Sequence, residues 1–246
     1  MRLENHLEAE MKLEEPLKMG DKTYDALIIR EASGFDEEEV SQPKFKGNMG
    51  LIYGEIIFRC IAEVPGAERL PTRAELKNLP SGVLDTILLG IRELSAGEEA
   101  HLIGKCPNKE CGKDFDQTIN LSDIEFTKGS YKSKMLELKR GINREGKTYK
   151  KAVIKVPDGN SQEVLLKHKS LDEFGMIKTD IILSLIINID GIKPSRDEVV
   201  AMSNMDRKAV LDAVKDSPGP KTVFSITCGY CGTEFQHNLN VLDFLV

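Results

Sequence analysis

Four of the five cysteines in this 246-residue chain occur as two closely spaced pairs. Cys106 and Cys111 stand in CPNKECG, and Cys228 and Cys231 stand in CGYCG. Two thiolates separated by a tight turn can reach one tetrahedral ion at about 2.3 Å, and a glycine after the second cysteine permits the turn. Two such pairs supply the four thiolates of a closed structural site that has no open position for water. We therefore predict one structural zinc ion per chain, bound by these four cysteines.

Other roles for these thiols stay open at this point. The same four thiolates suit iron, although a closed site without an electron-transfer context favours zinc. The plainer alternative is four reduced thiols that bind no ion. His101 and His237 flank the pairs and are expected at the surface or in packing, because four thiolates already complete a site. Cys60 lies in an apolar segment and is expected to be a packed core thiol.

The cysteine pairs lie in a stretch of sequence that occurs twice. Each copy predicts a helix, a glycine-containing turn, a strand into the cysteines, a strand out through a phenylalanine, and a closing Asx-Leu/Val-x-Asp segment. One two-thiolate hairpin binds zinc poorly, whereas two together form a site that contributes on the order of 10 kcal/mol to folding. The predicted ion therefore joins the copies and closes residues 112–227 into a loop. The matched positions are Ser95 with Ser217, Gly97 with Gly219, Cys111 with Cys231, Gly112 with Gly232, Phe115 with Phe235, Asn120 with Asn240 and Asp123 with Asp243.

Helix and strand patterns surround the two copies. Alternation in KTYDALIIRE predicts a strand, and apolar patterns predict helices at 48–64, 82–94, 180–192 and 206–214. The dipeptide Asp158-Gly159 predicts the turn of a hairpin within residues 147–168. Residues 2–19 are charge-rich, with apolar residues every four positions, and predict a weakly amphipathic helix or a partly disordered arm. Capping boxes mark three helix starts, at Thr72 with Glu75, Ser170 with Glu173 and Ser195 with Glu198.

These elements predict the architecture of the chain. The expected fold class is α+β, with duplicated helix and β-hairpin units joined by a four-cysteine, zinc-ribbon-like clasp, and with a basic β-hairpin and helices inserted between them. Residues 1–21 are expected to be an N-terminal arm that a partner orders, and residues 22–246 a single domain. That domain divides into a first half at 22–127, an insert at 128–204 and a second half at 205–246.

Charge restricts the classes of partner. With 34 basic and 40 acidic side chains the net charge is −6, which gives no global attraction to nucleic acid or to an anionic membrane. The N-terminal residues lack the pattern of a signal peptide, and no apolar segment reaches the roughly 18 residues of a membrane span. The protein is therefore expected to stay in the cell that makes it.

Residues 128–155 depart from this balance, with ten Lys or Arg against two Glu. They are expected to form either a solvated hairpin whose charges prevent strand pairing or a binding face for an acidic protein or nucleic acid. The scarcity of aromatic residues there lowers the expectation of nucleic acid. The candidate partner-binding residues are Lys139, Arg140, Arg144, Lys147, Lys150 and Lys151.

Catalytic patterns are missing from the sequence. It contains no glycine-rich phosphate loop, no His-Glu-x-x-His motif and no serine elbow. A catalytic zinc site keeps three protein ligands and a water, and no such set is evident here. We therefore expect a protein that is not an enzyme.

A family resemblance covers roughly residues 22–246. Its motifs are TYDALIIRE, LPSGVLDTILLGIRELSAGEE, CPNKECGKDFDQTINLSDIE, VPDGNSQEVLLKH, SLDEF and the C-terminal CGYCGTEFQHNLNVLDFLV. Together they resemble the T4-like baseplate hub proteins and hub assembly chaperones of contractile-tailed phages and related injection systems. In that family the cysteine pairs look like a zinc-ribbon-type element, which carries over to Cys106, Cys111, Cys228 and Cys231. The first pair departs from this pattern by its wider spacing.

The resemblance implies a non-enzymatic role in building or completing the central hub of the tail baseplate. It implies contacts with baseplate hub or other tail proteins, without direct nucleic-acid or membrane binding and in a copy number that the sequence leaves open. The expected location is the cytoplasm of the bacterial host during assembly, with the tail baseplate of the virion as a further location. The alternative function is that of a zinc-ribbon nucleic-acid-binding regulator, for which binding would depend steeply on salt.

Overall fold

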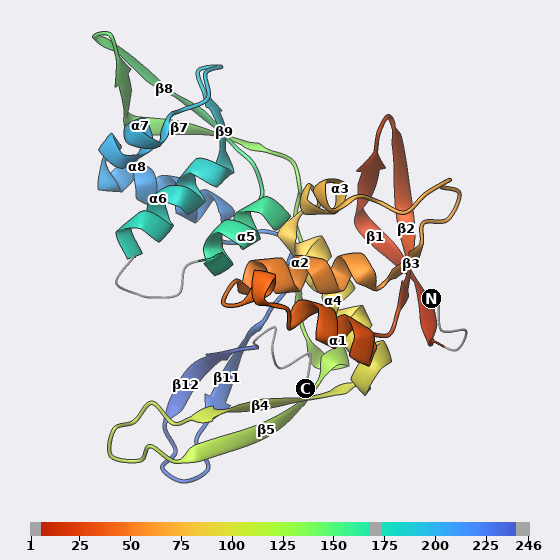
Figure 1. Ribbon diagram of the computed structural model, residues 1–246. Helices are drawn as coiled ribbons and strands as arrows, with labels where there is room; N and C mark the ends of the chain where they lie inside the picture. Colours follow the sequence, from red (N-terminus) through yellow and green to blue (C-terminus); the bar gives the residue numbers. More distant parts are fainter. Residues whose placement is uncertain (1–5, 168–173, 240–246) are drawn as a thin grey trace.

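The computed structural model, which describes residues 6–167 and 174–239, places helices around two three-stranded sheets and sets two further hairpins side by side (Figure 1). The predicted mixed α+β class is confirmed. Buried apolar side chains form two separate clusters, here called the first core and the second core. The first core includes residues of the segments 13–124 and 226–239, and the second core includes residues of the segment 138–210.

The first core is built on an antiparallel sheet of order β1-β2-β3. Helix α4 contacts β1 and β2, and Gly90 permits the close approach: a Cβ there would lie 2.4 Å from Met11 Cε. Ile29 and Ile87 are almost completely buried between these elements. The elements are β1 (Glu8–Met19), β2 (Lys22–Arg30), α1 (Gly34–Val40), η1 (Pro43–Phe45), α2 (Met49–Arg59), β3 (Ile61–Glu63), α3 (Arg73–Lys77) and α4 (Ser81–Ala96).

The second core lies between an antiparallel sheet of order β7-β8-β9 and three helices. Helix α8 contacts β7, helix α6 contacts β9, and α5 connects the two cores by contacts with α2 and α6. The elements of this part of the chain are β7 (Lys134–Arg144), β8 (Lys147–Ile154), the connecting helix α5 (Gly159–Lys167), α6 (Phe174–Leu185), β9 (Ile186–Ile189), α7 (Arg196–Ala201) and α8 (Asn204–Val214).

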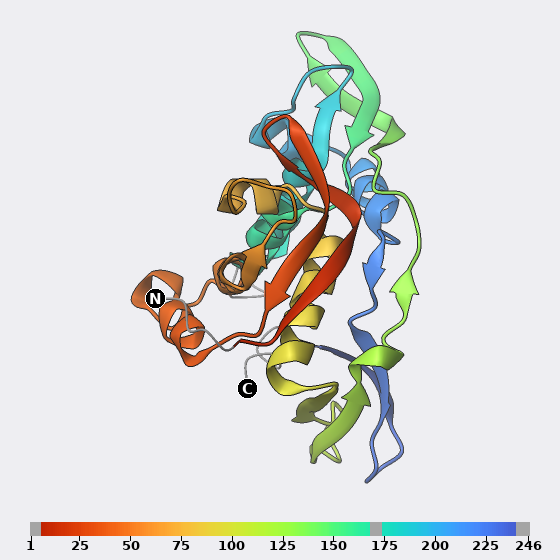
Figure 2. The same cartoon turned by 90° about the vertical axis from the view of Figure 1, so that its right-hand side faces the viewer.

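The two cysteine-bearing hairpins lie at the opposite end of the molecule from the β7–β8 hairpin (Figure 2). The first consists of β4 (Glu99–Lys105) and β5 (Asp114–Asn120), and the second of β11 (Val223–Thr227) and β12 (Glu234–Asn238). The first is followed by η2 (Leu121–Asp123) and β6 (Phe126–Thr127). Strand β6 pairs with β10 (Gly219–Pro220), so the chain leaves for the second core and returns from it at neighbouring points.

Several predicted elements are confirmed. Strand β2 matches the predicted strand, and α4 and α8 match the helices predicted at 82–94 and 206–214. The capping boxes at Thr72 with Glu75 and at Ser195 with Glu198 form as predicted. The box at Ser170 with Glu173 lies outside the described residues. In the described part of the chain, every helix is too short or too polar to span a bilayer.

The N-terminal prediction is wrong for residues 8–19. They form strand β1, paired with β2, rather than an amphipathic helix or a disordered arm. Leu13, Leu17 and Met19 are buried in the first core. Residues 8–13 alternate polar and apolar side chains as a strand does, and a register shift between Lys12 and Leu17 interrupts that alternation.

The hairpin prediction at 147–168 is also wrong. Residues 147–154 do form β8, but their hairpin partner is the preceding strand β7, and the turn is Glu145-Gly146. Both turn residues have positive φ, 50° and 78°, as a tight hairpin turn requires. Asp158 instead precedes helix α5, where its carboxylate accepts a hydrogen bond from the backbone amide of Ser161 at 3.0 Å.

Two predicted helices end earlier than expected. The segment 180–192 is helical only to Leu185 and continues as strand β9, so it is not one buried helix. The helix predicted at 48–64 ends at Arg59, and Cys60 is the residue that caps it. Cys60 is completely buried in the first core, as expected of a packed thiol.

Candidate metal centre

Four sulfur atoms from the two hairpins lie close enough together to bind one ion. The Sγ atoms of Cys106, Cys111, Cys228 and Cys231 all lie within 4.8 Å of one another. The Sγ–Sγ distance is 3.7 Å between Cys106 and Cys231 and 3.8 Å between Cys111 and Cys228. Tetrahedral Zn–S bonds of about 2.3 Å would place ligand sulfurs about 3.8 Å apart. The predicted ligand set therefore converges at a spacing that suits a four-thiolate ion.

The two cysteine turns have matching backbone geometry despite their different lengths. The amide of Cys106 donates to the carbonyl of Lys113, and the amide of Cys228 donates to the carbonyl of Thr233, both at 2.9 Å. The glycines after the second cysteines, Gly112 and Gly232, have φ of 55° and 71°. Only glycine adopts that conformation readily, which explains why both turns carry it. The additional residues of the first turn change its length and leave the closing hydrogen bond in place.

Aromatic packing holds the two hairpins together next to the sulfur atoms. The rings of Phe115 and Phe235, which occupy matched positions in the repeat, meet edge to face with centroids 5.2 Å apart. The ring of His237 also packs edge to face on Phe115. Gly104 leaves room for the Phe115 ring, because a Cβ at position 104 would lie 2.9 Å from that ring. His101 is exposed and pairs with Asp116, so both histidines have the roles expected of them.

The environment of the sulfur atoms is uneven. Cys106 and Cys228 are buried, Cys111 is half-buried and Cys231 is exposed. The Thr233 hydroxyl, 3.2 Å from the Sγ atom of Cys231, and the Thr233 amide lower the pKa of Cys231 to about 6. Removal from water raises the pKa of Cys106 to about 12. A divalent cation would favour the thiolate form of every ligand and would release protons on binding.

Thr233 and Asn108 are polar neighbours of the cluster that the sequence did not reveal. The side-chain amide of Asn108 donates to the Thr233 hydroxyl at 3.2 Å and lies 3.9 Å from the Sγ atom of Cys231. These contacts tie the first cysteine turn to the second. The sequence signal that could have indicated this contact is the hydroxyl residue Thr233, two places after the last cysteine.

The predicted partner-binding residues lie on the β7–β8 hairpin, far along the chain from the cysteines. Arg144 is half-buried and forms a two-pronged ion pair with Glu198 of α7. The remaining five, Lys139, Arg140, Lys147, Lys150 and Lys151, are exposed. The structure thus brings the four cysteines together in one cluster and places the basic residues on a separate surface.

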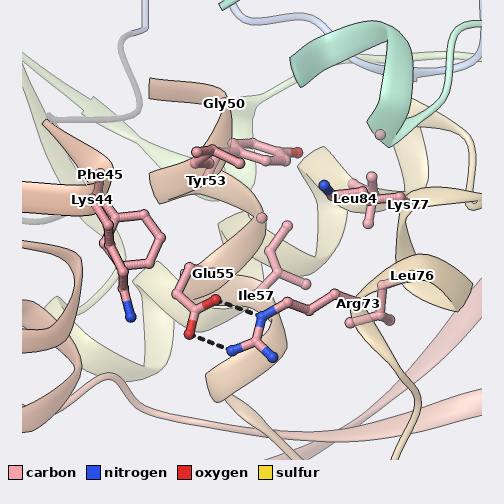
Figure 3. A pocket seen from close by; sticks show the side chains of 13 residues that line it. Lys44, Phe45, Gly50, Tyr53, Glu55, Ile57, Arg73, Leu76, Lys77 and Leu84 are labelled. Carbon is pink, nitrogen blue, oxygen red and sulfur yellow. Dashed lines mark hydrogen bonds and ion pairs between the residues drawn. The ribbon is translucent and has the colours of Figure 1, made fainter. Parts of the chain in front are cut away.

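An apolar pocket of about 280 Å³ lies beside helix α2 (Figure 3). Four charged side chains line it. Glu55 and Arg73 pair with each other through two hydrogen bonds of 2.7 Å each, and Lys44 and Lys77 pair with Glu39 and Glu163. Nearby, the Tyr53 hydroxyl donates to Asp85 at 2.7 Å. Ion pairs therefore already satisfy the charged groups of this pocket, which offers apolar surface rather than reactive side chains.

An α+β fold with four thiols gathered where two hairpins meet defines a protein with a candidate structural metal centre. Residues 27–246 match the family described as T4 bacteriophage base plate protein. The chain therefore belongs to that family, which supports a structural role in the baseplate of a phage tail. The resemblance predicted from the sequence is confirmed at this level. No curated protein and no solved structure matches the chain.

Proposed function

We propose that this chain is a non-enzymatic structural or assembly protein of the central hub of a contractile tail baseplate, and that one zinc ion fixes its shape. The observation that supports this most directly is the convergence of Cys106, Cys111, Cys228 and Cys231 in a chain of the baseplate family. The cysteines come from two hairpins far apart in sequence, so an ion bound there would act on the tertiary structure.

Zinc would close the long loop of chain that carries the second core, here called the excursion. The excursion begins after β6 and ends at β10, and these strands pair over only two residues each. Such a short ladder contributes little stability by itself. It must also offset the conformational entropy that is lost when the long loop between β6 and β10 is closed. A four-thiolate zinc site can contribute on the order of 10 kcal/mol, which is large beside the whole stability of a domain. The metal would therefore determine how firmly the second core is attached.

Four thiolates suit zinc and iron alike, and we infer zinc because a closed site without an electron-transfer context favours an ion that has no redox chemistry. The low pKa of Cys231, about 6, means that one ligand is already a thiolate at neutral pH. Binding of the ion would favour the thiolate form of the ligands and release the protons that they still carry. Bound zinc would hold the two hairpins in a fixed relation and would leave no position for a reacting water.

The proposed partners are baseplate hub or other tail proteins. The proposed place of action is the cytoplasm of the bacterial host during tail assembly, and a chain that remained in the finished particle would lie in the tail baseplate. The family match supports contact with tail proteins, and the net charge of −6 opposes general binding to nucleic acid.

Assembly in cells tests this proposal. Cells that make the full set of tail proteins would receive the wild-type chain, Cys228→Ser, Cys60→Ala or no chain, and completed baseplates would be counted by electron microscopy. We expect completed hubs with the wild-type chain and Cys60→Ala, and few with Cys228→Ser or with no chain. Normal hub completion in the absence of the chain would reject the hub role. Normal completion with Cys228→Ser would reject the dependence on zinc.

A further inference from the structure

The β7–β8 hairpin carries a cluster of cations that have no acidic partner among residues 6–167 and 174–239. Its tip extends beyond helix α7 (Figure 1). Five exposed side chains define this basic cluster: Lys139, Arg140, Lys147, Lys150 and Lys151. Within the described part of the chain, none of the five lies within ion-pair distance of a carboxylate, whereas Arg144 on the same hairpin is held by Glu198. The structure therefore separates one arginine held by a carboxylate from five exposed cations whose charge a partner's carboxylates can meet.

The backbone that carries the basic cluster is rigid. Residues 138–141 bulge out of the ladder, and the buried carboxylate of Asp206 accepts hydrogen bonds from the amides of Lys139, Arg140 and Gly141. Gly141 has φ of 70°, and a Cβ there would lie 2.2 Å from the carbonyl oxygen of Tyr149. Lys150 and Lys151 are fixed in the same way, because their amides donate to Asp190. A fixed backbone lowers the entropy cost of binding through these side chains.

The surroundings of the cluster favour a protein partner over nucleic acid. Tyr149 is the aromatic residue of the hairpin, and its ring packs against the second core. The charged groups of Arg144 and Lys147 lie 5.4 and 5.7 Å from its centroid, so the ring is not free to stack on a base. Met135 on β7, whose register partner Val153 lies two residues from Lys151, is 77% exposed and offers apolar contact at that end of the cluster. Carboxylates of a protein surface, mixed with apolar groups, match this combination.

We propose that the basic cluster docks an acidic surface of another tail protein. The proposal rests on the proposed function, since that function places the partner among the tail proteins. The cations would attract and orient the partner, and Met135 would add apolar contact at the same surface. The cysteine centre lies at the other end of the molecule and takes no part in this contact (Figure 2).

Binding to defined probes tests the proposal with the full zinc-loaded chain. The probes are a labelled peptide rich in Asp, Glu and Leu, and a single-stranded DNA of equal charge. The hairpin variant replaces Lys139, Arg140, Lys147, Lys150 and Lys151 with Gln. The control variant replaces five exposed lysines elsewhere and has the same net charge: Lys12, Lys18, Lys22, Lys46 and Lys215. We expect the hairpin variant to bind the peptide about tenfold more weakly and the control variant to change by about twofold or less.

Two results of the binding measurement would overturn the proposal. Equal losses in the two variants would show a general charge effect, and tighter binding of DNA than of peptide, lost only in the hairpin variant, would assign the cluster to nucleic acid. A carbodiimide, which joins lysine amines to carboxylates, would then be applied to mixtures with purified tail proteins. Crosslinks concentrated at Lys139, Lys147, Lys150 and Lys151 support docking, and crosslinks concentrated elsewhere reject it. Neither measurement depends on hub completion, so failure here is distinct from failure of the hub role.

Discussion

Gly82 at the start of α4 and Gly219 in β10 are in direct backbone contact. A Cβ on Gly219 would lie 2.6 Å from the Cα atom of Gly82, and a Cβ on Gly82 would lie 2.0 Å from the carbonyl oxygen of Pro218. Gly219 also has φ of 144°, which side-chain-bearing residues rarely adopt. The helix of the first copy thus meets the glycine turn of the second. The two copies are joined here as well as at their hairpins.

Replacing Gly82 with Ala should destabilise the protein. Alanine is the better helix former, by about 1 kcal/mol, but its methyl group would meet backbone atoms that cannot move aside easily. We expect a loss of about 1–3 kcal/mol in the free energy of unfolding, measured by urea denaturation. Gly54→Ala in α2 is the matched control, because a Cβ there meets nothing within 4 Å. Similar shifts of the two urea midpoints would contradict the proposed contact.

The zinc content should depend on the four clustered cysteines and not on Cys60. We expect about one zinc ion per chain in the wild-type protein and in Cys60→Ala, and much less in Cys228→Ser. A chelator should lower the melting temperature of the wild-type chain and leave that of Cys228→Ser almost unchanged. Elemental analysis and thermal unfolding measure both effects. A wild-type melting temperature that does not respond to the chelator would count against a structural ion.

The ion pair of Arg144 and Glu198 should make stability depend on pH. The hydrogen bond from Arg144 lowers the pKa of Glu198 to about 2, below its usual value of 4.5. A lowered carboxyl pKa gives stability that is present above about pH 4.5 and is lost as the pH falls toward 2. Asp36 acts in the same direction: burial alone would raise its pKa, but hydrogen bonds from Arg30, Ser33 and Arg59 hold that pKa well below its usual range.

The variant Glu198→Gln isolates this contribution. At pH 7 we expect it to be less stable than the wild type by about 1–2 kcal/mol, because the pair is only partly shielded from water. The difference should shrink as the pH approaches 2, where Glu198 is increasingly protonated in the folded wild type. Urea unfolding at several pH values measures it. A difference that stays constant between pH 7 and pH 2 would show that Glu198 acts through its role in capping α7.

Asp206 should be essential to the shape of the β7–β8 hairpin. Asp206→Ala would leave three bulge amides without their acceptor, and we expect a loss of about 3 kcal/mol or more. Asp212→Ala on the same helix removes an exposed ion pair with Lys208 and should cost about 0.5 kcal/mol or less. Hydrogen exchange of residues 139–141 gives the local measurement. Unchanged protection of these amides in Asp206→Ala would contradict this role.

The two Asp-Gly dipeptides show why the hairpin was misplaced. Asp190-Gly191 forms a tight turn in which both residues have positive φ, 49° and 82°. Asp158-Gly159 has the same letters, yet Asp158 caps the start of α5 and Gly159 begins the helix. Asp serves equally well as a turn residue and as a helix cap, so the dipeptide alone does not choose between them. Whether an Asp-Gly dipeptide forms a turn or caps a helix depended on the strand with which the neighbouring segment could pair.

The segment 180–192 shows the same limit for apolar runs. Its length and composition suit a buried helix, but residues from Ile186 onward pair with β8 and complete the second sheet. Residues 8–19 likewise became a strand because β2 offered a partner and the first core could bury Leu17. Periodicity records which face a segment buries, whereas strand pairing depends on a partner that is distant in sequence.

The sequence by itself determined the four-cysteine cluster, the repeat, the capped helices and the family. These depend on short-range spacing: two thiols per turn, a glycine after each pair, and a capping residue three places before its partner. Only the tertiary structure decided that α4 and α8, the matched helices of the repeat, pack in different cores. It also decided that Arg144 is held by Glu198 while five neighbouring cations stay exposed. The reason is physical, because burial and ion pairing arise between side chains that the chain brings together only when it folds.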